Sequence, residues 1–181
     1  MNKGFSLVEL LVAVVVFLIA ATAAVGVFSS ALRNQRYILA SQQLLDQSSY
    51  ALEYMSKSLR MAKENEGNEC GIGSGNTYGT PAADSLKIKS QRKECQTFSL
   101  AGSAGNQQLV DSRKEVGGEE VYSYLPLLSE DFNVQDFGVF IMEDSSQQPR
   151  VTIMLDIVGR QLKDKPRMRL QTTVSQRDLK Q

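Results

Sequence analysis

The sequence predicts an α+β fold in which one long N-terminal helix packs on a mainly antiparallel β-sheet. Past residue 28, no helix-breaking residue occurs until Gly67, and the apolar residues follow a helical period. Beyond Gly67, short segments alternate apolar and polar residues with a period of two, which is typical of half-buried strands. A length of 181 residues leaves room for one ordinary domain in addition to a membrane segment.

Residues 10–28 form a segment that is long and apolar enough to span a bilayer. Only Thr22 and Gly26 in it are not plainly apolar, and no residue in it is charged. Because a membrane helix needs roughly 20 apolar residues, this segment can cross the membrane once. Gly26 leaves two interpretations open, a local weakening of the helix or close packing against another helix.

The N-terminus has three interpretations. The first is a secretory signal, because Ala21-Thr22-Ala23 has the small residues that a signal peptidase needs, and the mature chain would then start at Ala24. The second is an uncleaved membrane anchor, which explains the length of the apolar segment but not the carboxylate of Glu9 at its start. The third depends on the residues at the beginning of that segment.

The apolar segment begins with a specific pattern, Gly4-Phe5-Ser6-Leu7-Val8-Glu9-Leu10. This pattern resembles the leader of type IV prepilins and type II secretion pseudopilins. The resemblance implies that a prepilin peptidase cleaves between Gly4 and Phe5, that the new amine of Phe5 is N-methylated, and that the apolar helix is retained. It also implies a pilin-like fold in a single-pass inner-membrane protein, with an extracytoplasmic C-terminal domain that later joins a pilus or pseudopilus.

Glu9 would be the fifth residue of the cleaved chain, where the family usually has a glutamate. An ionised carboxylate inside a bilayer or a helix bundle costs a few kcal/mol unless it finds a partner. In a filament of packed helices, the free amine of Phe5 on a neighbouring subunit is such a partner, and the pair would select the register of assembly. Alternatively, Glu9 reaches the membrane interface from near the end of the helix.

Residues 29–64 are predicted to continue the helix as its amphipathic half. Apolar residues recur at intervals of seven, and a second set interleaves with them: Ile38, Leu45, Leu52 and Leu59, then Ser41, Ser48, Met55 and Ala62. Leu44 and Ala51 widen this stripe. It predicts that the helix packs along its own domain, and a coiled-coil dimer is the alternative. The expected divisions of the chain are a leader (1–4), a transmembrane half-helix (5–28), an amphipathic half-helix (29–64) and a globular β-rich extracytoplasmic domain (65–181).

Cys70 and Cys95 both follow the apolar segment, where the chain is expected to be outside the cytoplasm and free to oxidise. We expect a disulfide that joins a loop rich in Gly, Ser, Asn and Thr to the sheet, worth about 3.5 kcal/mol on the chain-entropy account. The chain has no histidine to activate a thiol. A nucleophilic cysteine is therefore not expected, and two cysteines alone cannot form a closed zinc site.

Strands are predicted where apolar and polar residues alternate. The clearest pair is 151–158 and 167–174, which indicates an antiparallel hairpin because the residues between them are polar. The other expected strands are 86–89, 97–100, 107–111, 121–125 and 138–142.

The later half of the chain also resembles part of the larger minor pilins, the J-type pseudopilins and W-type minor pilins. The segments that carry this resemblance are 129–134, 137–141, 148–153 and 170–175. It implies a subunit that sits at the filament tip with other minor subunits and primes assembly.

Four cations lie close together on and after the first expected strand: Lys87, Lys89, Arg92 and Lys93. Such residues at a solvated strand edge oppose edge-to-edge pairing. The alternative is contact with DNA phosphates, although no aromatic residue interleaves with the cations to stack bases.

Two acidic pairs, Glu119-Glu120 and Glu130-Asp131, offer oxygen ligands for calcium. Neither pair has the spaced ligands of a calcium loop, so we expect turns or helix caps and no metal site.

Composition excludes several functional classes. Twenty basic and twenty acidic residues give no net charge that would direct the protein to nucleic acid. Without histidine, and without a phosphate loop, nucleophile elbow or metalloprotease motif, we expect neither an enzyme nor a cofactor.

The leading hypothesis is a minor pilin or pseudopilin that helps to initiate or cap a type IV pilus or type II secretion pseudopilus. Its expected partners are prepilin peptidase, other major and minor pilins or pseudopilins, the inner-membrane assembly platform and membrane lipid, with nucleic acid not expected. The alternative is a DNA- or surface-binding tip pilin of a competence pilus.

Overall fold

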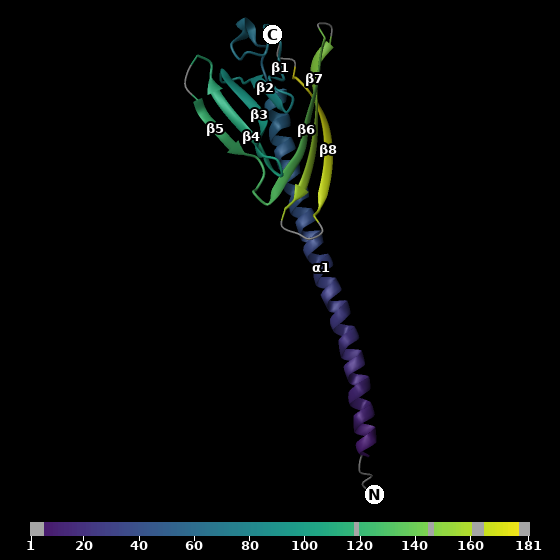
Figure 1. Cartoon of the computed structure of the whole chain (residues 1–181). Coiled ribbons are helices and arrows are strands. Elements are labelled where there is room, and N and C mark those ends of the chain that lie inside the picture. The colour runs from purple at the N-terminus through teal and green to yellow at the C-terminus, as the bar shows by residue number, and fades with distance from the viewer. Residues whose placement is uncertain (1–5, 118–119, 145–146, 161–164, 178–181) are drawn as a thin grey trace. The chain divides into compact units, whose positions relative to one another are not determined.

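The computed structural model describes residues 6–117, 120–144, 147–160 and 165–177. The chain forms two compact units, residues 1–39 and 40–181. Helix α1, Leu7–Arg60, contributes residues to both units (Figure 1).

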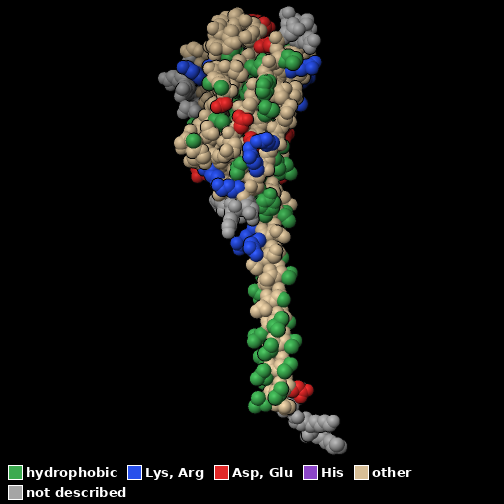
Figure 2. Space-filling view, turned by 45° about the vertical axis from the view of Figure 1, so that its right-hand side comes forward, with side chains coloured by type: hydrophobic (Ala, Val, Ile, Leu, Met, Phe, Trp, Pro, Cys, Tyr) green, Lys and Arg blue, Asp and Glu red, His purple; other side chains and the backbone are tan. Residues whose placement is uncertain are grey.

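In the first unit, α1 is a helix whose apolar side chains are exposed. Every described residue of this unit except Ala21 is exposed, and Figure 2 shows hydrophobic side chains along the visible side of this segment. The hydroxyl of Thr22 donates a hydrogen bond to the carbonyl of Ile19 at 2.9 Å. The helix therefore satisfies its own polar groups, as a segment in lipid must.

The second unit contains the end of α1, a short 3-10 turn and two antiparallel sheets. The first sheet has the strand order β1-β2-β3-β4-β5 and the second has the order β6-β7-β8. Figure 1 shows the two sheets on either side of the last turns of α1. The elements after α1 are η1 (Glu66–Asn68), β1 (Tyr78–Gly79), β2 (Ser85–Lys89), β3 (Glu94–Ser103), β4 (Asn106–Glu115), β5 (Glu120–Pro126), β6 (Phe132–Asp144), β7 (Gln147–Gly159) and β8 (Arg167–Ser175).

The α+β prediction is confirmed, and every predicted strand lies within a longer strand of the structure. The structure differs in having two sheets where one was expected. It also has β1, a strand of two residues that is too short to give an alternation signal.

The part of α1 in the second unit packs on its own sheets, and all its buried residues belong to the predicted stripe. The buried residues of the helix are Leu44, Ser48, Ala51, Met55 and Leu59, whereas Leu45 keeps 46% of its surface exposed. A straight helix drifts about 20° per heptad from a strict repeat of seven, so one heptad position cannot face a flat sheet throughout. Burial of Ser48 is possible because its hydroxyl donates to the carbonyl of Leu45 at 3.0 Å.

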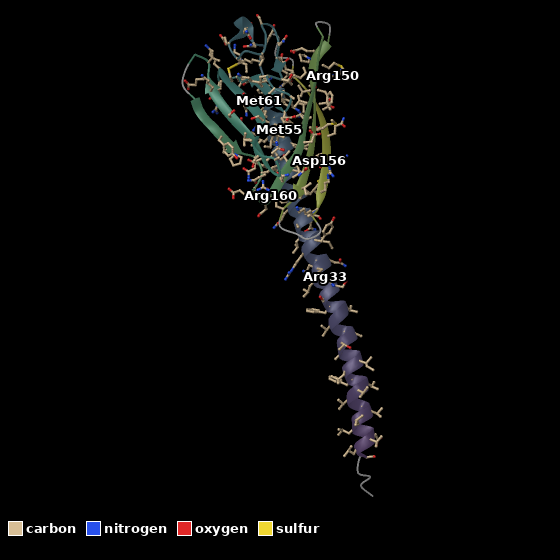
Figure 3. The ribbon with its side chains drawn as sticks, in the orientation of Figure 1. Arg33, Met55, Met61, Arg150, Asp156 and Arg160 are labelled. Carbon is tan, nitrogen blue, oxygen red and sulfur yellow. A yellow bond between two sulfur atoms is a disulfide. The ribbon has the colours of Figure 1, made fainter. Side chains whose placement is uncertain are left out.

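A single large core joins the helix to both sheets. The first sheet contributes Leu86 and Ile88, both fully buried. In the second sheet, the alternating residues that the hairpin pattern placed inward are at most 1% exposed: Val151, Ile153, Leu155 and Ile157. Figure 3 labels Met55, which lies on the part of α1 between the sheets. The prediction of one buried face for these strands is therefore confirmed.

The helix ends at Arg60, before the expected end at Glu64. The reason is a competing partner, because the N–H of Lys63 donates to the carbonyl of Lys89 at 2.9 Å and the two residues form an isolated β-bridge. The chain thus leaves the helix by pairing with the end of β2.

The last described residues of the chain cap the end of α1. The N–H of Arg177 donates to the carbonyl of Arg60 at 3.0 Å, and the side-chain amide of Gln176 donates to the carbonyl of Ala62 at 3.0 Å. Carbonyls at a helix C-terminus have no partner within the helix. The segment after β8 supplies the missing donors.

Candidate functional site

The predicted processing residues, Gly4 and Phe5, lie outside the described residues. The described part of the chain begins at Ser6, whose carbonyl accepts the N–H groups of Glu9 at 3.0 Å and Leu10 at 3.2 Å. Glu9 therefore lies in the first turn of α1, where the helix dipole favours a carboxylate. Glu9 is exposed. The described residues offer it no ion pair.

The helix that carries Glu9 is long and apolar enough, by length and composition, to cross a membrane. No residue in the most apolar stretch of this helix is buried inside the molecule. Exposed apolar surface of this extent marks contact with lipid or protein.

Gly26 lies inside the uninterrupted helix. No atom lies within 4 Å of the position that a Cβ would take there, so packing within this chain does not require a glycine. Local weakening of the helix and close approach of another chain's helix both remain as interpretations.

Cys70 and Cys95 form a disulfide with their Cα atoms 5.5 Å apart. The pair is buried with Ile72 in a small cluster separate from the main core. The disulfide joins the loop after η1 to β3, and the side-chain oxygen of Asn65 accepts the N–H of Cys70 at 3.2 Å. The predicted disulfide is thus present and holds the glycine-rich loop against the first sheet.

The four cations predicted as a cluster have different surroundings. Lys89 forms an ion pair with Glu69 at 2.5 Å, and only 12% of its side chain is exposed. Lys87 is half-buried on β2, while Arg92 and Lys93 lie in the turn between β2 and β3. We expected β2 to be the edge of its sheet, but β1 pairs with it, so β2 is not an edge strand. The pairing of Lys89 reduces the charge available to a phosphate.

The acidic pairs are described only in part. Glu119 lies outside the described residues, as does the side chain of Glu120. Glu130 and Asp131 lie in the connection between β5 and β6, and the carbonyl of Asp131 accepts the N–H of Arg160 at 2.8 Å. Within the part of the chain that the structure describes, no group of three or more potential metal ligands occurs.

A buried polar network, which the sequence reasoning missed, fixes α1 to the first sheet. Asp111 is fully buried and accepts hydrogen bonds from the Tyr54 hydroxyl at 2.7 Å and the Gln96 amide at 2.8 Å. Arg113 donates to the Tyr54 oxygen at 2.7 Å. The signal in the sequence was Asp111, an acidic residue at the C-terminal end of the predicted strand 107–111. Buried hydrogen-bonded networks of this kind favour one arrangement of a core.

A second charged group lies on β7 and β8. Asp156 accepts hydrogen bonds from Arg167 at 2.9 and 2.6 Å and from Arg169 at 2.6 Å. The hydrogen bond from Arg167 is the largest cause that lowers the pKa of Asp156, and it outweighs desolvation. This group links the two strands of the predicted hairpin.

Residues 1–25 match the family model of the prokaryotic N-terminal methylation motif. The match contains Gly4, Phe5, Glu9 and most of the membrane-length segment. Comparison of the chain with curated proteins and with solved structures found no match.

Proposed function

Because the N-terminal methylation motif indicates a member of the type IV pilin and pseudopilin family, we propose that the chain is a minor pilin or pseudopilin. It is a structural subunit that helps to initiate or cap a type IV pilus or a type II secretion pseudopilus. The observation that carries this proposal is the motif itself, which overlaps the start of a helix whose most apolar stretch has no buried residue.

The first step of the proposed function is processing in the inner membrane. Prepilin peptidase cleaves after Gly4, and the amine of Phe5 is methylated. The apolar part of α1 stays in lipid while the second unit lies on the extracytoplasmic side, where the disulfide forms.

The second step is assembly with other pilins or pseudopilins at the inner-membrane platform. Glu9 lies in the first turn of α1, within reach of the Phe5 amine of a neighbouring subunit in a bundle of such helices. In a low dielectric the unpaired carboxylate is costly, so pairing favours one register while apolar contacts supply the packing.

The minor, initiating role is supported by the resemblance of segments 129–134, 137–141, 148–153 and 170–175 to the larger minor pilins. A methylation motif of this family indicates a structural subunit rather than an enzyme.

Processing is tested by the mass of the mature protein after expression with a prepilin peptidase. We expect a chain that starts at methylated Phe5, and a Gly4→Ala variant that keeps its leader. A mature chain that starts at Ala24 would support the secretory signal and remove the apolar helix, and an uncleaved chain would support the simple anchor.

Assembly is tested by removing the subunit, and separately by Glu9→Gln, in the cell that makes the filament. An initiating subunit lowers the number of filaments per cell and leaves their length unchanged. We expect Glu9→Gln to lower the number of filaments as much as removal of the subunit does, although this variant should be processed normally and its second unit should fold normally. Filament numbers that do not change in either strain would contradict the initiating role.

The competence-pilus alternative is a DNA- or surface-binding tip. Its candidate contacts are Lys87, Lys89, Arg92 and Lys93, of which Lys89 is paired with Glu69. A variant with all four changed to glutamine separates the two functions. Loss of DNA binding with filaments intact would favour the tip adhesin, and unchanged DNA binding would exclude these cations as its site.

A further inference from the structure

A groove runs along the exposed side of α1 in the second unit. It consists of two adjoining hollows of about 880 and 450 Å³, which share Lys57, Met61 and Gln91. Residues 173–177 form one wall, and the turn between β2 and β3 with Gln91 and Arg92 forms the other. Figure 3 labels Met61, which directly follows the last residue of α1. We call this feature the helix groove, and the volume of each hollow is within the range of ligand sites, roughly 300 to 1,000 Å³.

Basic side chains outnumber carboxylates in the helix groove. The basic residues are Lys57, Arg60, Arg92, Arg113 and Arg177, and the carboxylates are Glu53 and Glu94. Arg113 and Glu94 pair with each other at 3.5 Å. The side chains of the other four cations form no ion pair with any described residue, in contrast to Lys89, Arg167 and Arg169, which do. The groove therefore has positive charge without an internal partner.

One wall of the groove is the free edge of a strand. Among the described strands, β8 pairs only with β7. The N–H of Gln176 donates to Pro149 on the β7 side, whereas the N–H of Arg177 donates to Arg60 on the opposite side. Backbone groups alternate in direction along a strand. Ser175, and every second residue before it, therefore directs its N–H and C=O away from β7 and towards the free edge.

We propose that the helix groove binds an extended, acidic segment of another protein. The segment adds to the free edge of β8 as a further strand and places its carboxylates near Lys57, Arg60 and Arg92. Strand addition supplies affinity through main-chain hydrogen bonds, and the cations select acidic side chains. This proposal is independent of filament initiation, because it concerns only the second unit.

Two observations favour a peptide over nucleic acid as the occupant. A strand edge offers donors and acceptors in the spacing of another peptide backbone. Single-stranded nucleic acid instead needs aromatic platforms. Tyr54 is the aromatic residue that lines the described groove, and its ring already packs against Tyr50 and Phe98, with centroids 6.5 and 6.3 Å apart.

The test measures peptide binding to the full-length protein in detergent micelles by fluorescence anisotropy. The probe is a labelled octapeptide of alternating Glu and Thr, compared with one of alternating Gln and Thr. We expect the Glu peptide to bind roughly tenfold more tightly at low salt, and the difference to shrink as salt is added.

A groove variant and a matched control test the charges. The variant Lys57→Gln, Arg60→Gln, Arg92→Gln should bind the Glu peptide roughly tenfold more weakly. The control Lys114→Gln, Arg150→Gln, Lys165→Gln removes the same charge at exposed positions outside the groove, and its affinity should stay within about twofold of the unmodified chain. Equal weakening in both variants, or in neither, would overturn the proposal.

Proline at the free edge tests strand addition. Ser175→Pro removes an N–H that points away from β7, so it should weaken binding while thermal unfolding stays unchanged. A Glu peptide that is N-methylated on every amide keeps its charge but has no N–H on either edge to donate, and it should not bind even if Ser175→Pro unfolds. Tight binding of that peptide, or stronger binding of an oligothymidylate than of the Glu peptide, would overturn strand addition by an acidic segment.

Discussion

The two units of the chain differ in where their apolar residues lie. In the first unit, Leu18 keeps 56% of its surface exposed, whereas in the second unit Leu155 keeps 1%. Burial of apolar surface is the main source of folding free energy, at about 25 cal/mol per Å². The second unit therefore supplies its own stability. The first gains a favourable environment only from lipid or from other helices.

The largest expected difference comes from matched leucine substitutions in the two units. Leu155→Ala should lower the free energy of unfolding of the second unit by about 2 to 5 kcal/mol, because it leaves a cavity in the core. Leu18→Ala should change it by less than about 0.5 kcal/mol. Urea unfolding of the full-length chain in micelles, followed by near-ultraviolet circular dichroism, measures both. A similar loss in both variants would show that the first unit contributes to the folding of the second.

The disulfide should have the next largest effect, and only in the second unit. Replacing both cysteines, with Cys70→Ala and Cys95→Ala, should lower the free energy of unfolding by about 3 kcal/mol, because the unfolded chain loses a crosslink. The same denaturation experiment measures the loss.

Membrane extraction supplies the control for this variant. We expect both the unmodified chain and the protein without cysteines to remain in the membrane fraction after a carbonate wash. Release from the membrane would mean that the disulfide also affects the first unit.

Asp156 should give a smaller effect that depends on pH. In the folded state the pKa of Asp156 is lowered from its ordinary value of 3.8. Its contribution to the free energy of unfolding is therefore fully present above about pH 4 and is lost as pH falls through the folded pKa. At pH 7, Asp156→Asn should cost about 1 kcal/mol. When urea unfolding is measured at lower pH, the difference in free energy of unfolding between this variant and the unmodified chain should shrink.

Asp84→Asn is the control for this comparison, because Asp84 is exposed. We expect no such pH-dependent difference for it. A loss at Asp156 that stays constant down to the lowest pH would mean that packing, and not charge, explains the effect.

The smallest effect is expected at Gly26, in the first unit. Gly26→Ala should stabilise the helix by about 1 kcal/mol. Amide hydrogen exchange around this residue should therefore slow by roughly fivefold. The unfolding of the second unit should not change. If exchange is unaffected, the glycine serves close packing against another helix.

The sequence was sufficient to predict the elements because local patterns determine them. Alternation located β2 and the β7–β8 hairpin, and the apolar run located the first part of α1. The buried face of α1 was predicted in outline, since Ser48, Met55 and Leu59 are buried, but Leu45 in the same stripe stays 46% exposed. How much of each stripe residue is covered depends on where the two sheets close over the helix, and no local pattern contains that information.

The candidate site was predictable to a different degree in each unit. The motif around Gly4, Phe5 and Glu9 is continuous in sequence, so the order of residues alone identifies it. The helix groove brings Lys57 together with Arg92 and Arg177, which are far apart in the chain. Only the folded arrangement reveals their proximity.

The capping of α1 by the end of the chain has a consequence for the order of folding. Gln176 contacts Ala62 across 114 positions, so the helix end obtains its partner only when the last strand has been made. Contacts of such sequence separation form slowly, because a long loop must close first. The second unit thus completes its folding only after its C-terminal residues have been synthesised, and a truncation of only the last few described residues would expose the end of the helix.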